Sequence, residues 1–194
     1  SSRHTELGSI DAEAEKILVF RNLTFDGNAL QNIMLEATAP YIFIDNVEFT
    51  NGCKAIKITG APKVVAITNC RFHTNVAGGV GPMIDMTSLS ASETTVIFRD
   101  NYVEGATPSV DGDGTSGLDI SSTGMSNTVR CIIRGNHFRE LGILGGAGGV
   151  RIQHGHDSVI DTNVFSKIMS TPIWIESSSR MRITGNKIVS ESSK

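Results

Sequence analysis

Short apolar phrases recur along the chain at a nearly constant spacing. Each has an apolar residue, then two or three residues rich in Asn, Asp, Gly or Thr, then an aromatic or β-branched residue. The copies are FRNLTF (20–25), IDNVEF (44–49), ITNCRF (67–72), FRDNYV (98–103), IRGNHF (133–138), IDTNVF (160–165) and ITGNKI (183–188). Their last residues lie 24, 23, 31, 35, 27 and 23 positions apart, which indicates one repeated structural unit.

A second series of phrases, apolar–variable–apolar, falls between successive copies of the first. It comprises IML (33–35), IKI (56–58), IDM (84–86), LDI (118–120), VRI (150–152) and IWI (173–175). Such short strands are unstable alone, but stacked about 4.8 Å apart, coil upon coil, they form parallel sheets around a shared core. The pattern predicts a β-solenoid with one internal row made of Ile33, Ile56, Ile84, Leu118, Val150 and Ile173.

The repeat resembles the right-handed parallel β-helix of the pectate-lyase-like superfamily, in which each coil carries a phrase of the form V-x-I-x-N-N-x-F. The resemblance covers about residues 17–189. It implies an all-β, single-stranded right-handed parallel β-helix of about seven coils. The same fold hosts lyases, hydrolases, epimerases, adhesins and virus tailspikes, so the resemblance does not by itself select a function.

The phrases also predict the domain organisation. Residues 17–190 are expected to form the β-helix, 1–16 an N-terminal flank or cap with a turn near 11–16, and 191–194 a tail. Solenoid ends expose strand edges that need covering. We therefore expect a homotrimer or attachment to a larger spike, similar to virus tailspikes, at an extracellular or virion surface.

Asparagine and phenylalanine recur at fixed places in the first phrase, and both series are expected to be structural. Asparagine tolerates the left-handed backbone of a bend, and its amide can bond to the coil above. The expected bend residues are Asn22, Asn46, Asn69, Asn101, Asn136, Asn163 and Asn186. The expected internal aromatic stack is Phe25, Phe49, Phe72, Phe138 and Phe165.

Three consecutive coils carry insertions at the same turn, at residues 73–82, 104–116 and 139–149. Insertions confined to one face of a solenoid commonly mark its binding face. We therefore expect them to line one edge of a groove.

The floor of this groove is predicted from the alternation of side chains along a strand. The middle residues of the second phrase form an outward column of Met34, Lys57, Asp85, Asp119, Arg151 and Trp174. Two positions further along lies a second column of Glu36, Thr59, Thr87, Ser121, Gln153 and Glu176. His154 and His156 follow directly in the coil of Arg151.

Adjacent carboxylates in this column permit acid–base chemistry. Asp85 and Asp119, one coil apart, approach the separation of roughly 5 to 5.5 Å used by retaining glycosidases, and their proximity should raise one pKa. Alternatively, Arg151 or Lys57 serves a uronate lyase while the aspartates hold calcium. The column can also be a plain charge ladder.

The resulting site assignment divides catalysis from binding. Asp85, Asp119 and Arg151 are the candidate catalytic residues. The candidate substrate-binding residues are Lys57, Gln153, His154, His156, Trp174 and Glu176. Trp174 is the only tryptophan of the chain and suits stacking on a sugar ring.

Cofactor signals are weak. Residues 111–119 (DGDGTSGLD) resemble the opening of an EF-hand loop, so calcium is a possible ligand, but Ser116 and Ser122 replace its glycine and closing glutamate. HGH at 154–156 resembles a polygalacturonase motif whose accompanying acidic signatures are missing. No other metal or cofactor is expected.

Composition narrows the partners. The chain has 194 residues and a net charge of −3, which suits one domain and gives no attraction to nucleic acid or anionic membrane. Three hypotheses remain open: a polysaccharide-cleaving enzyme, a non-catalytic glycan-binding spike or adhesin, and a structural trimeric shaft.

Overall fold

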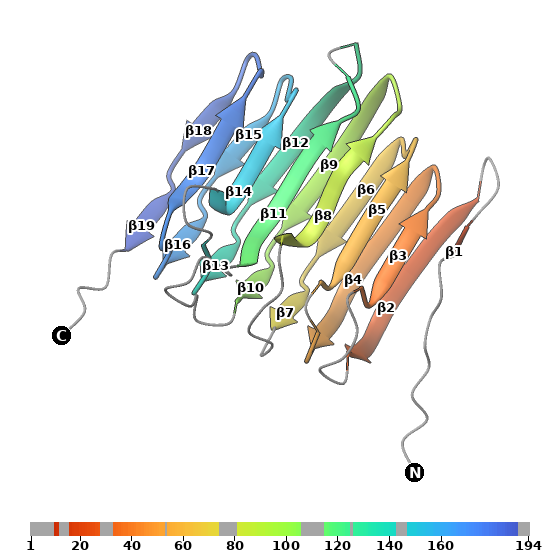
Figure 1. Ribbon diagram of the computed structural model, residues 1–194, viewed down its shortest axis with the longest axis horizontal. Coiled ribbons are helices and arrows are strands. Elements are labelled where there is room, and N and C mark those ends of the chain that lie inside the picture. The colour runs from red at the N-terminus through yellow and green to blue at the C-terminus, as the bar shows by residue number, and fades with distance from the viewer. Residues whose placement is uncertain are drawn as a thin grey trace.

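The computed structural model describes residues 10–11, 16–27, 33–52, 54–73, 81–105, 115–124, 126–142 and 147–189. Within these ranges the chain forms β-strands and no helix, and all strand pairs are parallel. Successive coils stack side by side from the N-terminal to the C-terminal end (Figure 1). The predicted parallel β-solenoid is confirmed.

A seven-stranded sheet forms one side of the solenoid. In spatial order it contains β1 (Ile10–Asp11), β3 (Leu35–Thr38), β5 (Ile56–Gly60), β8 (Gly81–Leu89), β11 (Thr115–Ser122), β14 (Ala147–Gln153) and β17 (Thr171–Glu176). This sheet carries the second series of phrases. Its first strand, β1, precedes residue 17 and pairs with β3.

A twelve-stranded sheet encloses the rest of the core and has two limbs that meet at the long strand β4 (Tyr41–Thr50). One limb continues through β6 (Val64–Thr68), β9 (Glu93–Arg99), β12 (Thr128–Arg134), β15 (Val159–Asp161) and β18 (Arg182–Thr184). The other continues through β7 (Arg71–His73), β10 (Tyr102–Glu104), β13 (His137–Arg139), β16 (Val164–Ser166) and β19 (Lys187–Val189). Strand β2 (Ile17–Asp26) pairs with β4 along both limbs.

The internal row of the seven-stranded sheet is confirmed at five of its six positions. Ile56, Ile84, Leu118, Val150 and Ile173 are successive register partners. The prediction of Ile33 was wrong, because Leu35 is the partner of Ile56 and is fully buried. Ile33 and Leu35 are both apolar and lie two positions apart, so alternation alone leaves this coil two possible registers.

The phenylalanines form the expected internal stack, and Phe98 joins it in the coil where the row itself has Val103. Neighbouring rings of Phe25, Phe49 and Phe72 lie nearly parallel, with centroids 5.0 and 5.1 Å apart. Val103 occupies the next position of the row. Phe98, which enters from β9, continues the stack at 6.1 Å from Phe72 and at 6.1 Å from Phe138. The stack therefore stays unbroken, because a ring from a neighbouring strand fills the volume that valine leaves.

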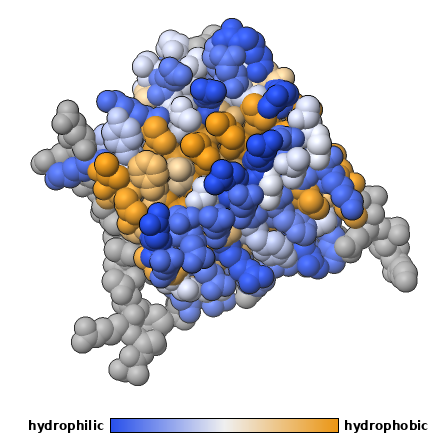
Figure 2. Space-filling model, turned by 180° about the vertical axis from the view of Figure 1, so that it is seen from behind, coloured by the Kyte–Doolittle hydropathy of each residue, from blue (hydrophilic) through white to orange (hydrophobic). Residues whose placement is uncertain are grey.

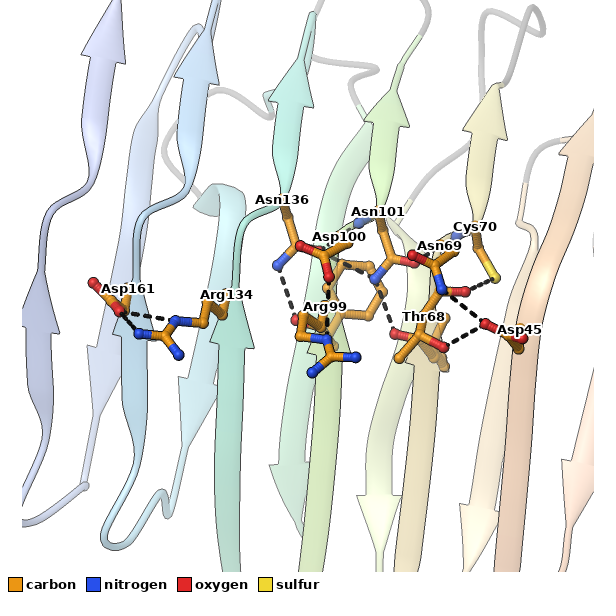
Figure 3. A network of polar contacts seen from close by, with 12 residues as sticks. Asp45, Thr68, Asn69, Cys70, Arg99, Asp100, Asn101, Arg134, Asn136 and Asp161 are labelled. Atoms are coloured by element: carbon orange, nitrogen blue, oxygen red, sulfur yellow. Dashed lines mark hydrogen bonds and ion pairs between the residues drawn. The ribbon is translucent and has the colours of Figure 1, made fainter.

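The bend between the two limbs explains why the asparagines shift by one position. In the first coils Asn22, Asn46 and Asn69 themselves adopt positive φ. In later coils the preceding residue has positive φ and the asparagine points inward, as in Asp100–Asn101 (Figure 3). The expected structural role is confirmed in both forms.

The inward asparagines form a buried ladder from Asn101 to Asn186. Asn136 Oδ1 accepts hydrogen bonds from Asn101 N at 2.9 Å and Asn101 Nδ2 at 3.1 Å. Asn136 Nδ2 donates to Asn163 Oδ1 at 2.9 Å and to Phe98 O at 2.9 Å. Each amide thus satisfies backbone groups that the bend removes from the sheet.

Candidate functional site

The outward column of the seven-stranded sheet is present, but its first member differs from the prediction. Successive register partners are Glu36, Lys57, Asp85, Asp119, Arg151 and Trp174. Met34 is buried and does not belong to this column. Because the register of this coil is shifted by two residues, Glu36 pairs with Lys57 and heads this column, and it does not belong to the second column.

The second outward column is partly as predicted. Ser121, Gln153 and Glu176 are register partners across β11, β14 and β17. A register irregularity in β8 makes Ser88, and not the predicted Thr87, the partner of Thr59. Thr87 instead turns its hydroxyl onto Asp85.

Asp85 is held as a carboxylate by three donors. Its Oδ2 lies 2.6 Å from Lys54 Nζ, and its Oδ1 accepts bonds from Thr87 Oγ1 at 2.7 Å and Thr87 N at 3.1 Å. Burial raises the pKa of Asp85, but the hydrogen bonds from Lys54 and Thr87 outweigh it and hold the pKa below its ordinary value.

Asp119, one coil further, is in the opposite situation. Its Oδ2 lies 3.2 Å from Arg151 Nη1, whereas its Oδ1 is buried without a hydrogen-bond partner in the described part of the chain. Arg151 is shared, because its Nη2 also lies 3.2 Å from Glu176 Oε2. Burial raises the pKa of Asp119 above its ordinary value, since the attraction of Arg151 does not compensate for it and the charges of Asp85 and Glu176 add to the rise.

These opposite shifts predict opposite effects on stability. A raised pKa in the folded state stabilises the protein below the ordinary pKa of 3.8, and that contribution is lost as pH rises through the raised value. Relative to Asp119→Asn, the wild-type protein should therefore lose stability as pH rises from 3.8 through the raised pKa of Asp119. Relative to Asp85→Asn, it should gain stability as pH rises from the lowered pKa to 3.8. Urea unfolding over a pH series measures both differences, and parallel profiles for all three proteins would contradict the assignment.

The flanking members of the column differ in what they offer to a ligand. Lys57 Nζ lies 2.8 Å from Glu36 Oε1, which raises the pKa of Lys57. Lys57 thus pairs with Glu36, and Asp85 pairs with Lys54. Trp174, beside Arg151, keeps 38% of its surface exposed. Gln153 is half-buried next to Glu176.

The two histidines lie past the end of β14, in the turn toward β15. His154 has positive φ, and its Nδ1 lies 3.1 Å from Ser122 Oγ. His156 contacts Ser179 Oγ at 3.0 Å and Asp157 at 3.1 Å. The structure thus groups Asp85, Asp119, Arg151 and Glu176 tightly and places the histidines in the turn beyond that group.

The insertions are described only at their ends. Residues 74–80, 106–114 and 143–146, and with them the first part (111–114) of the calcium-like segment 111–119, lie outside the described residues. The strands they connect, β7 to β8, β10 to β11 and β13 to β14, belong to consecutive coils. Among the described residues, no group of three or more His, Cys, Asp or Glu side chains could hold a metal ion.

Two features of this region were not predicted from the sequence. Lys54, just before β5, reaches across to Asp85 in the next coil. The signal that could have indicated this pair was a long basic side chain in the coil before an outward aspartate. At the ends of β7, β10 and β13, where the insertions begin, Glu104 lies 2.8 Å from His73 Nδ1 and 3.7 Å from Arg139 Nε.

An open hollow of about 450 Å³ lies at the bend of the other sheet. Its lining includes Asn46, Glu48 and Arg71 and none of the predicted site residues. Asn46 Nδ2 donates to Asn22 Oδ1 within it, so these amides already serve the bend. The candidate site therefore remains the column of the seven-stranded sheet.

Of the comparisons with known proteins, a family model supports the fold. No curated protein and no solved structure matches the chain. No helix long and apolar enough to cross a membrane occurs in the ranges that the structure describes. The model of the family described as the right-handed beta helix region matches residues 87–193, which are more than half of the chain and include Asp119, Arg151 and Trp174. With its parallel coils and matching repeat, the chain belongs to the right-handed β-helix family.

Proposed function

We propose that the outer face of the seven-stranded sheet binds a surface or acidic polysaccharide and hydrolyses it, with Asp119 as the proton donor and Asp85 as the second carboxylate. One observation carries this proposal: two aspartates in adjacent coils have pKa values displaced in opposite directions. Such divergence separates the acid from the base in carboxylate pairs.

The proposed steps give each carboxyl group a different role. Asp119, whose raised pKa favours the protonated form, gives its proton to the glycosidic oxygen as the bond to the sugar breaks. Asp85, oriented by Lys54 and Thr87, attacks the sugar carbon and forms a covalent bond to it as the leaving group departs. Asp119, now a carboxylate, then takes a proton from water, and the water oxygen displaces Asp85 from the sugar, which restores both carboxyl groups. Strands about 4.8 Å apart suit the roughly 5 to 5.5 Å separation of the retaining mechanism.

The same geometry disfavours the lyase alternative. A lyase base must be neutral before it removes a proton. The carboxylates beside Arg151 and Lys57 raise the pKa of both groups and so oppose the neutral form. Arg151 and Lys57 then contribute positive charge toward an acidic sugar, and the exposed face of Trp174 offers a stacking surface.

A non-catalytic glycan-binding spike is the second candidate, and the ion pairs favour it. Arg151 lies between Asp119 and Glu176, and Lys57 lies on Glu36, so charges of the column compensate one another without a ligand. A structural shaft requires nothing more than this pairing. The predicted homotrimer, larger spike and extracellular or virion location stay predictions.

A product assay distinguishes these functions. The protein is incubated with a panel of capsule and cell-wall polysaccharides, and the products are examined for new reducing ends and unsaturated uronates. Reducing ends without unsaturation support the hydrolase, whereas unsaturated ends support a lyase. Quenching of Trp174 fluorescence without product supports the glycan-binding spike, since this is the only tryptophan.

A further inference from the structure

A band of apolar side chains crosses the outer face of the limb that runs from β2 to β15 (Figure 2). One outward residue from each of six strands forms its central row, in register from coil to coil. The row is Val19, Phe43, Ala66, Ile97, Ile132 and Val159. This face belongs to the other sheet and is independent of the proposed polysaccharide site.

The band is widest at the N-terminal coils. Val19 and Phe43 have 58% and 36% of their surface exposed, and Ile17 in the neighbouring row has 60%. Tyr41, the partner of Ile17, and Val64, the partner of Tyr41, extend that neighbouring row. A contiguous apolar surface of this kind marks an interaction site more often than a free surface.

A row of mostly charged residues borders the band on its other side. From the N-terminal coil onward the row is Arg21, Asp45, Thr68, Arg99, Arg134 and Asp161. Asp45, Thr68, Arg99, Arg134 and Asp161 lie along one line of neighbouring strands (Figure 3). Within the chain, Arg21 pairs with Asp45 at 3.2 Å and Arg134 with Asp161 at 2.8 Å.

This row is complementary to itself in reverse order. A two-fold axis parallel to the strands and centred between β6 and β9 lays each row on the same row of a second copy, with the coil order reversed. Arg21 then faces the Asp161 position, Asp45 faces the Arg134 position, and Thr68 faces the Arg99 position. In the central row, Phe43 faces the Ile132 position and Ala66 faces the Ile97 position.

Other arrangements place like charges together. Moving the axis by half a coil, onto β9, sets Asp45 against the Asp161 position and Arg99 against itself. A parallel, coil-for-coil arrangement sets the row of Arg130 against the row of Arg134. Electrostatic complementarity selects register and partner orientation more than it adds affinity, so the reversed arrangement is specified while the apolar band supplies the attraction.

We propose that two copies of this chain associate through the band, with their solenoid axes antiparallel and with β4 of one copy facing β12 of the other. The interface is isologous, because each half repeats the same contacts. The charged row sets the register, and the central row forms the buried part of the interface.

Self-association and cross-linking test this arrangement together. Sedimentation velocity should show a dimer, and Phe43→Glu should weaken it at least tenfold, because a carboxylate then enters the apolar centre. Met169→Glu, at an exposed position outside the band, is the matched control and should leave the dimer unchanged. Circular dichroism shows that both variants remain folded.

Orientation is read from Phe43→Cys and Ile132→Cys, each prepared in a Cys53→Ser background and treated with a short bis-maleimide. The antiparallel dimer should cross-link the mixture of the two variants but neither variant alone, because like positions lie three coils, about 14 Å, apart. A monomer at all concentrations overturns the proposal. So does a dimer or trimer in which each variant cross-links to itself.

Discussion

Replacing Asp119 by asparagine is expected to lower polysaccharide turnover by about 100-fold or more, the usual loss when a positioned acid is removed. The amide keeps the shape of the side chain and can still accept a bond from Arg151, but its N–H protons are too weakly acidic to be given to the glycosidic oxygen. Binding, followed through Trp174 fluorescence, should change little. The measurement is reducing-end release at a fixed pH on whichever polysaccharide the panel identifies.

Two further variants make this result interpretable. Asp85→Asn should lower turnover to a similar extent, whereas Glu93→Gln, an exposed acidic residue on β9 of the other sheet, should leave turnover unchanged. If Asp119→Asn and Asp85→Asn both retain wild-type turnover and binding, the column is a charge ladder and the proposed site is wrong. If wild-type protein binds but releases no product, the glycan-binding spike is correct.

Replacing Asn136 by alanine is expected to reduce the free energy of unfolding by about 3 kcal/mol, one of the largest effects at a single position of this chain. The substitution leaves Asn101 N in the core without its acceptor, and an orphaned buried group costs about 1–3 kcal/mol. The bonds from Asn101 Nδ2 to Asn136 and from Asn136 to Phe98 O are lost as well, although Asn101 Nδ2 keeps its bond to Ile67 O. Urea denaturation measures the change. The corresponding drop in melting temperature is roughly 6–12 °C.

Asn22→Gly is the control for this experiment. Asn22 lies at the equivalent bend but is exposed, and it has a φ of 56°, which glycine adopts without strain. Its loss should cost well under 1 kcal/mol. Equal effects at both positions would show that the buried ladder contributes no more than the exposed bend.

The apolar phrases were sufficient to predict the class of fold. Five of the six internal positions of the seven-stranded sheet were identified, because each phrase has only one apolar–variable–apolar phase that agrees with its neighbours. The first coil was misplaced by two residues, since Ile33 and Leu35 both satisfy an internal position. The pairing of Leu35 with Ile56, made between coils, selects between them.

The candidate site was likewise predictable in its middle and not at its edges. Asp85, Asp119 and Arg151 follow from alternation within strands whose phase is unambiguous. Lys54 was missed because a long side chain at the start of a strand contacts the next coil, which no spacing within its own coil indicates. The exchange of Thr87 and Ser88 depends on an irregularity inside β8.

By itself, therefore, the sequence determined the repeat, the parallel solenoid and the residues that face outward, because these follow from periodicity along the chain. The tertiary structure decided the register at irregular coils, the partner of each charged side chain and the direction in which Asp85 and Asp119 shift their pKa. Those properties depend on burial and on contacts between residues of different coils. They arise only when the coils stack.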